Sequence, residues 1–196
     1  MIRVILCDDH ALIRRGIRDT LSDAVDIQVV GEAGDYGELR ALMRGTDGDV
    51  LLLDIHLPGR SGLDVLHALK DEGNPIKVLV VSMYPEDQYA LRALRAGAYG
   101  YVNKGGDPQL LVQAVHTVAQ GRKYVTPEIA QMLVESLTAP VVENPHERLS
   151  DRELQTLTMI ASGKRLSDIA EQLNLSPKTV SVYRARVLEK LGLANN

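Results

Sequence analysis

The first 104 residues alternate short apolar runs with amphipathic stretches, and this alternation restricts the possible folds more than any other feature of the chain. Runs rich in Val, Ile and Leu predict strands near residues 2–8, 27–32, 50–54, 77–82 and 99–102. Stretches with helical spacing predict helices near residues 11–23, 36–45, 62–72, 86–96 and 107–120. We therefore expect an α/β fold with a five-stranded parallel sheet, flavodoxin-like, in the strand order 2-1-3-4-5.

The C-terminal part follows a different pattern, which is all helical. Ser150 and Glu153 have the spacing of a capping box and predict the start of a helix. Further helices are expected from residue 167 to 173 and from Pro177 to Leu191, with a short turn between them. Two helices separated by three or four residues, the second one basic, predict a helix-turn-helix.

A linker is expected between these two parts. The stretch from Pro140 to Glu147 contains two prolines and has neither a helical nor an alternating period. We therefore predict a first domain over residues 1–122, a linker with one helix over residues 123–148, and a small all-α domain over residues 149–196.

Composition and charge restrict the possible functions. No apolar run approaches the roughly 20 residues of a membrane span, and the first residues lack a signal-peptide pattern, so we expect a cytoplasmic protein without membrane association. Cys7 is the single cysteine, so we predict a packed thiol. The net charge is −4, but residues 149–196 hold 7 Lys and Arg against 5 Asp and Glu. A nucleic-acid surface is therefore expected only in the C-terminal part.

Five polar residues follow predicted strands. Asp8 and Asp9 follow the first strand, Asp54 closes the third, and Ser82 and Lys104 lie at the ends of the fourth and fifth. The carboxyl ends of parallel strands meet at one edge, where three carboxylates repel one another unless a hard cation such as Mg²⁺ neutralises them. We predict a phosphoryl-transfer site, with Asp54 as nucleophile, the acidic pair on the cation, and Lys104 and Ser82 on phosphoryl oxygens.

The first part of the chain resembles the receiver domain of two-component response regulators. The resemblance rests on these five residues, on the run from Asp54 to Gly62 and on the segment from Gly97 to Lys104. The resemblance implies that a sensor histidine kinase phosphorylates Asp54. It also implies that Mg²⁺ is bound by Asp9, Asp54 and the backbone carbonyl of His56, with Asp8 acting mainly through water.

The resemblance also implies a switch. Ser82 would move toward the phosphoryl group and Tyr101 would turn inward, which favours a phosphorylation-dependent homodimer. A plain half-buried tyrosine is the alternative for Tyr101. His56 is expected to be a loop side chain, and the resemblance implies that it and Tyr84 influence the lifetime of the phosphoryl group. Receivers commonly have proline after the lysine, but Gly105 stands here, so we expect a trans peptide or a mobile loop and a less firmly held Lys104.

The C-terminal domain resembles the DNA-binding domain of the NarL/FixJ (LuxR-type) response regulators. Four stretches carry this resemblance: 149–153, Ile169-Ala170, 175–180 and 190–192. The family normally continues beyond Asn196 into another helix, so we expect a domain that lacks its last helix.

The last predicted helix has two faces. Its apolar residues Val180, Val187, Leu188 and Leu191 are expected to pack inward. The resemblance implies that double-stranded DNA is contacted by the other residues, the base edges by Ser181, Val182 and Ala185, and the phosphates by Lys178, Thr179, Arg184 and Arg186.

The sequence thus indicates a phosphorylation-regulated transcription factor that is not an enzyme. Two alternatives stay open. One is a Mg²⁺-dependent phosphatase with an aspartyl-phosphate intermediate, although such enzymes place two aspartates two residues apart after the first strand, whereas Asp8 and Asp9 are adjacent. The other is a receiver that acts only through protein interactions.

Overall fold

The computed structural model describes residues 1–138 and 148–193. The chain divides into two compact units, Met1–Thr138 and Ala139–Asn196, and each is described by itself. The domain limits predicted at residues 122 and 148 stay predictions, since compactness alone does not delimit a functional domain. The linker predicted from Pro140 to Glu147 lies outside the described residues.

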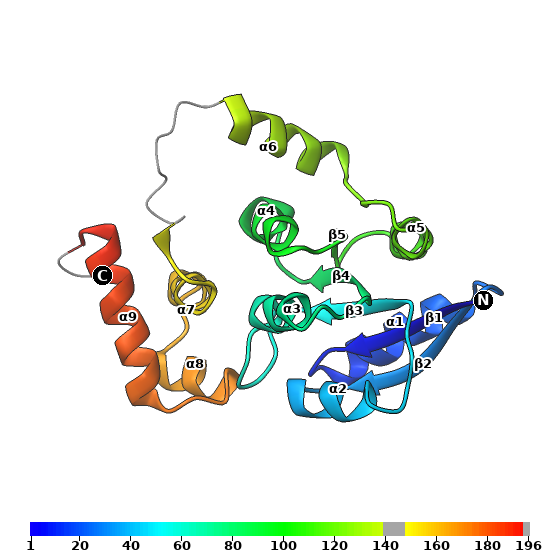
Figure 1. Cartoon of the computed structure of the whole chain (residues 1–196). Coiled ribbons are helices and arrows are strands. Elements are labelled where there is room, and N and C mark those ends of the chain that lie inside the picture. Colours follow the sequence, from blue (N-terminus) through cyan, green and yellow to red (C-terminus); the bar gives the residue numbers. More distant parts are fainter. Residues whose placement is uncertain (139–147, 194–196) are drawn as a thin grey trace. The chain divides into compact units, whose positions relative to one another are not determined.

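The first unit is built on a five-stranded parallel sheet in the order β2-β1-β3-β4-β5 (Figure 1). This arrangement confirms the predicted fold class. The strands are β1 (Ile2–Cys7), β2 (Ile27–Ala33), β3 (Val50–Asp54), β4 (Lys77–Ser82) and β5 (Gly100–Asn103). Each strand begins within two residues of its predicted start, because apolar runs of this length are buried on both faces of a parallel sheet.

Helices follow the strands in strict alternation. They are α1 (Ala11–Ser22), α2 (Tyr36–Leu42), α3 (Gly62–Asp71), α4 (Glu86–Ala96) and α5 (Pro108–Ala119). Alternate residues of β1, β3 and β4 form one buried cluster with Leu21 of α1 and with Leu111, Ala114, Val115 and Val118 of α5. Since side chains alternate along a strand, this cluster assigns α1 and α5 to one face of the sheet.

A sixth helix, α6 (Pro127–Thr138), packs on α4 within the first unit. The segment before it is fixed at the edge of the sheet, where the N–H of Tyr124 donates to the Tyr99 carbonyl at 2.8 Å. The Thr126 hydroxyl donates to Glu86 of α4 at 2.6 Å. This segment and α6 therefore continue the packing of the first unit beyond α5. None of the described helices has the length and apolar character that crossing a membrane requires.

The described part of the second unit contains α7 (Asp151–Ala161), α8 (Leu166–Gln172) and α9 (Pro177–Leu191). The predicted capping box is confirmed, because Ser150 and Glu153 each accept a hydrogen bond from the other's backbone N–H. A small apolar core joins the three helices through Met159, Ile169, Ala170, Leu173 and Val180. Helices α8 and α9 with their short connection form the predicted helix-turn-helix.

Within the described part of this unit, an ion pair joins α7 to α9. Lys190 Nζ of α9 lies 2.6 Å from Glu153 Oε2, whose side chain is buried. Burial opposes ionisation of Glu153, but the hydrogen bonds from Lys190 and Ser150 outweigh it and lower the pKa of this carboxyl. The stabilisation is therefore fully present above the unfolded pKa of about 4.3 and is lost as the pH falls through the lower folded pKa.

We expect Glu153→Gln to weaken this unit at pH 7 by about 0.5–1 kcal/mol, because Gln preserves the cap but not the charge, and Lys190 is partly exposed. Amide exchange of α7 and α9 in the full chain measures the effect, which should shrink at acidic pH. Glu171→Gln on the exposed side of α8 is the control. Equal protection of the Glu153 variant and the parent protein at pH 7 would contradict the assignment.

Candidate functional site

Lys104 joins two of the predicted acidic residues at the carboxyl edge of the sheet. Its Nζ lies 2.6 Å from Asp8 Oδ2 and 2.7 Å from Asp54 Oδ2, and all three side chains are at most 5% exposed. Burial raises the pKa of Asp54 and Lys104 opposes this, while the neighbouring Asp8 raises it further. One ammonium therefore compensates two buried carboxylates only in part.

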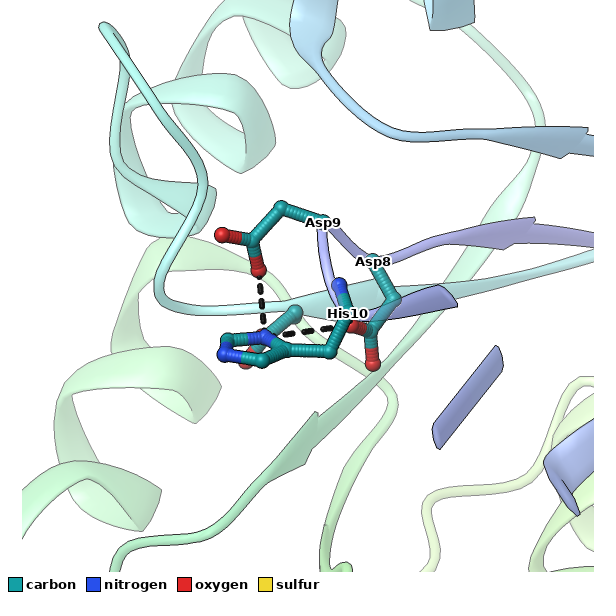
Figure 2. Close-up of side chains that lie close together, drawn as sticks. Asp8, Asp9 and His10 are labelled. Carbon is teal, nitrogen blue, oxygen red and sulfur yellow. Dashed lines mark hydrogen bonds and ion pairs between the residues drawn. The ribbon is translucent and has the colours of Figure 1, made fainter. Parts of the chain in front are cut away.

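The third carboxylate, that of Asp9, contacts His10, which no sequence pattern singles out. His10 Nδ1 lies 2.7 Å from Asp9 Oδ1 and 3.6 Å from Asp8 Oδ1 (Figure 2). The backbone N–H of His10 donates to Asp8 Oδ1 at 2.8 Å. Burial raises the pKa of Asp9, and His10 opposes that shift. The only signal in the sequence is that His10 directly follows the acidic pair.

The donor set suits a divalent cation. Ligand atoms of Asp8, Asp9, His10 and Asp54 all lie within 4.8 Å of one another, and three of the four are carboxylates. Mg²⁺ prefers oxygen ligands, and excess negative charge in a buried cluster favours a cation. The acidic cluster therefore fits Mg²⁺. A contribution from the His56 carbonyl stays a prediction.

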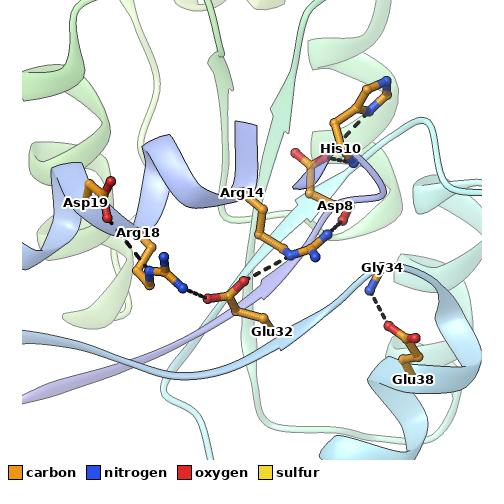
Figure 3. A network of polar contacts seen from close by, with 8 residues as sticks. All are labelled: Asp8, His10, Arg14, Arg18, Asp19, Glu32, Gly34 and Glu38. Carbon is orange, nitrogen blue, oxygen red and sulfur yellow. Dashed lines mark hydrogen bonds and ion pairs between the residues drawn. The ribbon is translucent and has the colours of Figure 1, made fainter. Parts of the chain in front are cut away.

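A network of ion pairs holds the acidic loop in place (Figure 3). Arg14 of α1 donates to the backbone carbonyl of Asp8 at 2.5 Å. Its guanidinium also pairs with Glu32 of β2 at 3.0 Å, and Arg18 pairs with the same carboxylate at 2.8 Å. These contacts fasten the loop after β1 to the neighbouring strand, so the acidic pair is positioned by both elements.

The loop after β3 folds tightly against Asp54. A Cβ on Gly62 would lie 2.0 Å from the Asp54 carbonyl oxygen, so no larger residue fits there. The N–H of Gly62 donates to the Ile55 carbonyl at 2.8 Å, and Ser61 with Asp64 forms a capping box at the start of α3. The loop that returns past Asp54 is therefore anchored at both ends.

Ser82 and Tyr101 lie fully buried beside this edge. The Tyr101 hydroxyl donates to the Tyr84 carbonyl at 2.7 Å, and Asn103 donates to the same oxygen at 3.0 Å. The Ser82 hydroxyl accepts from the Tyr84 N–H at 3.2 Å. Tyr101 is thus turned inward and is more deeply buried than the half-buried alternative supposes.

The peptide after Lys104 is trans, since the described residues contain no cis peptide bond. The N–H of Lys104 donates to the Ser82 carbonyl at 2.8 Å, and its ammonium is buried between two carboxylates. The expectation of a less firmly held lysine therefore does not match its contacts, because ion pairing and β4 hold the residue whether or not a proline comes after it.

Three rings gather beside Asp54. His56 stacks on Tyr84 with ring centroids 4.5 Å apart, and the buried Tyr89 contacts both rings edge-on at 6.2 and 5.5 Å. His56 is therefore a loop side chain within an aromatic cluster.

Cys7 is buried in β1, where burial above all raises the pKa of its thiol, as expected of a packed thiol.

Helix α9 has the two faces that its sequence predicts. Val180 and Val187 are buried, and Leu188 and Leu191 are partly buried. The residues predicted to approach DNA bases are exposed, including Val182, an apolar side chain at 43% exposure. Among the predicted phosphate contacts, Lys178 and Arg186 are exposed, and Thr179 and Arg184 are half-buried.

Two family models match the chain. Residues 4–116 match the response regulator receiver domain, and residues 147–196 match the bacterial regulatory proteins of the luxR family. The response regulator UvrY of Escherichia coli K12 is 40% identical over 98% of this chain and 89% of that protein. The response regulator GacA of Pseudomonas aeruginosa PAO1 is 40% identical over 100% of this chain and 92% of that protein.

The chain also matches solved structures of response regulators. RcsB of Salmonella enterica serovar Typhimurium, bound to the promoter rprA in the presence of the phosphomimetic BeF₃⁻, matches with 28% identity and a TM-score of 0.67, over 100% of this chain and 94% of that one. A LuxR-family response regulator from Aurantimonas sp. SI85-9A1 matches with 35% identity and a TM-score of 0.65, over 71% of this chain and 99% of that one.

Proposed function

Because this chain belongs to the two-component response regulators, with a receiver domain and a DNA-binding domain of the luxR family, we propose that a sensor histidine kinase phosphorylates Asp54 with the help of Mg²⁺. The family consists of transcription regulators rather than enzymes. Phosphorylation then promotes a homodimer that binds double-stranded DNA. The observation that carries this proposal is the buried Lys104 ammonium between the carboxylates of Asp8 and Asp54.

The residues of the site divide the chemistry among them. An Asp54 oxygen attacks phosphorus, and the bond from phosphorus to the donor's leaving group breaks as the new bond forms. Asp8, Asp9 and Asp54 would hold a bound Mg²⁺, which would supply positive charge between the approaching anions. Lys104 lies at the Asp54 carboxylate, where it can neutralise a phosphoryl oxygen, and Ser82 can donate to another.

Transmission to the second unit starts from contacts around Ser82. A shift of this side chain toward the phosphoryl group disturbs its hydrogen bond with the Tyr84 N–H, and the Tyr84 carbonyl is also bound by Tyr101. We propose that this loop carries the change to the surface of α4, β5 and α5, where the homodimer forms. A dimer presents two copies of α9 to paired DNA half-sites.

Two alternatives have less support. The phosphatase alternative conflicts with the family to which the chain belongs. The protein-interaction alternative leaves unexplained why small side chains and cations predominate on the exposed face of α9, where Glu189 is the acidic residue. The promoter-bound RcsB structure supports DNA as the partner, since the match covers 100% of this chain and 94% of the RcsB chain.

The proposal is tested by intact mass spectrometry after incubation with acetyl phosphate. With Mg²⁺ we expect one added phosphoryl group per chain, and with EDTA we expect none, because the carboxylates then repel the donor. Size-exclusion chromatography of the same samples should show a dimer only in the phosphorylated one. Labelling that is equally complete in EDTA would contradict the assigned chemistry.

The aromatic cluster predicts a phosphoryl lifetime effect. We propose that the stacked rings of His56 and Tyr84 restrict the approach of water to Asp54. His56→Ala and Tyr84→Ala should then each speed the loss of the phosphoryl group several-fold. Decay of the phosphorylated protein after donor removal measures this. His67→Ala, an exposed position on α3, is the control. Unchanged decay in both variants would mean that the rings do not restrict water.

The exposed face of α9 predicts a salt effect. Arg186→Ala should weaken binding to all DNA sequences similarly and reduce the slope of log K against log salt by about 1, as loss of one phosphate contact does. Fluorescence anisotropy with phosphorylated protein at several salt concentrations measures the slope. Arg44→Ala makes the same charge change at an exposed position of the receiver domain. An equal slope change in both variants would indicate a general charge effect instead.

A further inference from the structure

The imidazole of His10 lies at the rim of the acidic site, and the proposed phosphoryl transfer makes no use of it. His10 is the N-cap residue of α1, but its side chain makes no capping hydrogen bond. Instead, the ring turns back toward the two carboxylates that precede it, with Nδ1 as the nearest atom (Figure 2). The side chain is 50% exposed, so a dissolved ion can reach it.

The distances suit a shared ion. Nδ1 lies 2.7 Å from an oxygen of Asp9 and 3.6 Å from an oxygen of Asp8. With Asp54, the four ligand atoms span 4.8 Å. Ligands about 2.0–2.2 Å from one metal ion lie at most about 4.4 Å apart, so shifts of a few tenths of an ångström would bring all four into one coordination shell.

Lys104 does not occupy the position between these four ligand atoms. Its ammonium contacts Oδ2 of both Asp8 and Asp54, and the contact between Asp8 and His10 uses the other oxygen, Oδ1. A cation can therefore bind on the His10 side while Lys104 keeps its ion pairs. The positive charge of the bound cation would also reduce the repulsion between the carboxylates of Asp9 and Asp8.

The nitrogen donor changes which ions the site prefers. Carboxylate oxygens suit Mg²⁺, whereas imidazole suits Zn²⁺ and other transition metals of borderline softness. We propose that His10 Nδ1, together with the carboxylates of Asp8, Asp9 and Asp54, makes this site a binding site for a transition-metal dication such as Zn²⁺ or Co²⁺. The inference deepens the proposed function, since such an ion competes with Mg²⁺ for the oxygens that support phosphorylation.

Calorimetric titration of the full chain with CoCl₂ and with MgCl₂ tests the preference. His10→Asn should lower the Co²⁺ affinity about 10-fold or more and lower the ratio of Co²⁺ to Mg²⁺ affinity. Asn can still donate an N–H to Asp9. If His10 only positioned Asp9, the His10→Asn protein would therefore keep the Co²⁺ affinity of the parent. His67→Ala controls for loss of a surface histidine. Equal changes for both metals, or no change for Co²⁺, would overturn the proposal.

Imidazole nitrogen NMR of the unsubstituted protein gives a direct readout. On addition of Zn²⁺, the Nδ1 resonance of His10 should shift, with the His10→Asn protein used to assign it. A shift confined to other histidines would contradict the proposal. Neither measurement requires a phosphodonor, so failure of Asp54 phosphorylation and failure of metal binding by His10 are distinguishable.

Discussion

Asp54→Asn should abolish labelling by acetyl phosphate and should leave the protein monomeric at concentrations where the phosphorylated parent dimerises. Asn is close to Asp in shape but lacks the anionic oxygen that attacks phosphorus. It also removes one of the two carboxylates that Lys104 contacts. Intact mass and size-exclusion chromatography, each with and without phosphodonor, measure both effects in the full chain.

Asp71→Asn is the matched control for this variant. Asp71 is the exposed last residue of α3, so its loss changes the charge by the same amount without touching the site. The control should be labelled and should dimerise like the parent. A fully labelled Asp54→Asn protein would show that another residue accepts the phosphoryl group.

Lys104→Met should destabilise the receiver domain strongly in the absence of divalent cations. The ammonium is buried between Asp8 and Asp54, and removing one partner of a buried ion pair typically costs about 3–5 kcal/mol. The loss should narrow as the pH falls, because burial raises the pKa of Asp54 and protonation removes its charge. Urea unfolding at pH 7 and at lower pH measures both effects.

Mg²⁺ should recover part of this loss, since a bound cation compensates the same carboxylates. Lys70→Met, at an exposed position of α3, should change the free energy of unfolding little under either condition. If Lys104→Met is as stable as the parent at pH 7 without Mg²⁺, the ammonium does not compensate the buried carboxylates in the way proposed.

Much of this architecture could be predicted from the sequence because it depends on local patterns. Apolar runs of four to seven residues identify the strands, and their alternation with helices determines a parallel sheet. Once the sheet is parallel, Asp8, Asp54 and Lys104 must share an edge. The two faces of α9 could also be predicted, because the buried Val180 and the exposed Val182 follow from helical periodicity.

Other parts of the site depend on contacts between distant residues or on loop conformations. The pairing of Arg14 with Glu32 requires the register of β1 against β2, which the apolar pattern does not specify. The stack of His56 on Tyr84 depends on two loops that follow different strands. His10 is adjacent to the acidic pair in sequence, but only the turn of its ring brings Nδ1 to Asp9.

Lys104 illustrates how tertiary contacts outweigh a local signal. The absence of proline after it suggests a loosely held side chain. Its backbone is instead bound to Ser82, and its ammonium is buried between two carboxylates. Tyr101 is similar, because strand propensity gives no information on its hydrogen bond to the Tyr84 carbonyl.

The most direct test of a phosphorylation-controlled DNA-binding protein is footprinting on genomic fragments with and without acetyl phosphate and Mg²⁺. We expect paired half-sites to be protected at lower protein concentration when the phosphodonor is present, and we expect this gain to disappear in the Asp54→Asn protein. Protection that is the same with and without phosphodonor, or a gain that persists in Asp54→Asn, would contradict control of DNA binding through Asp54.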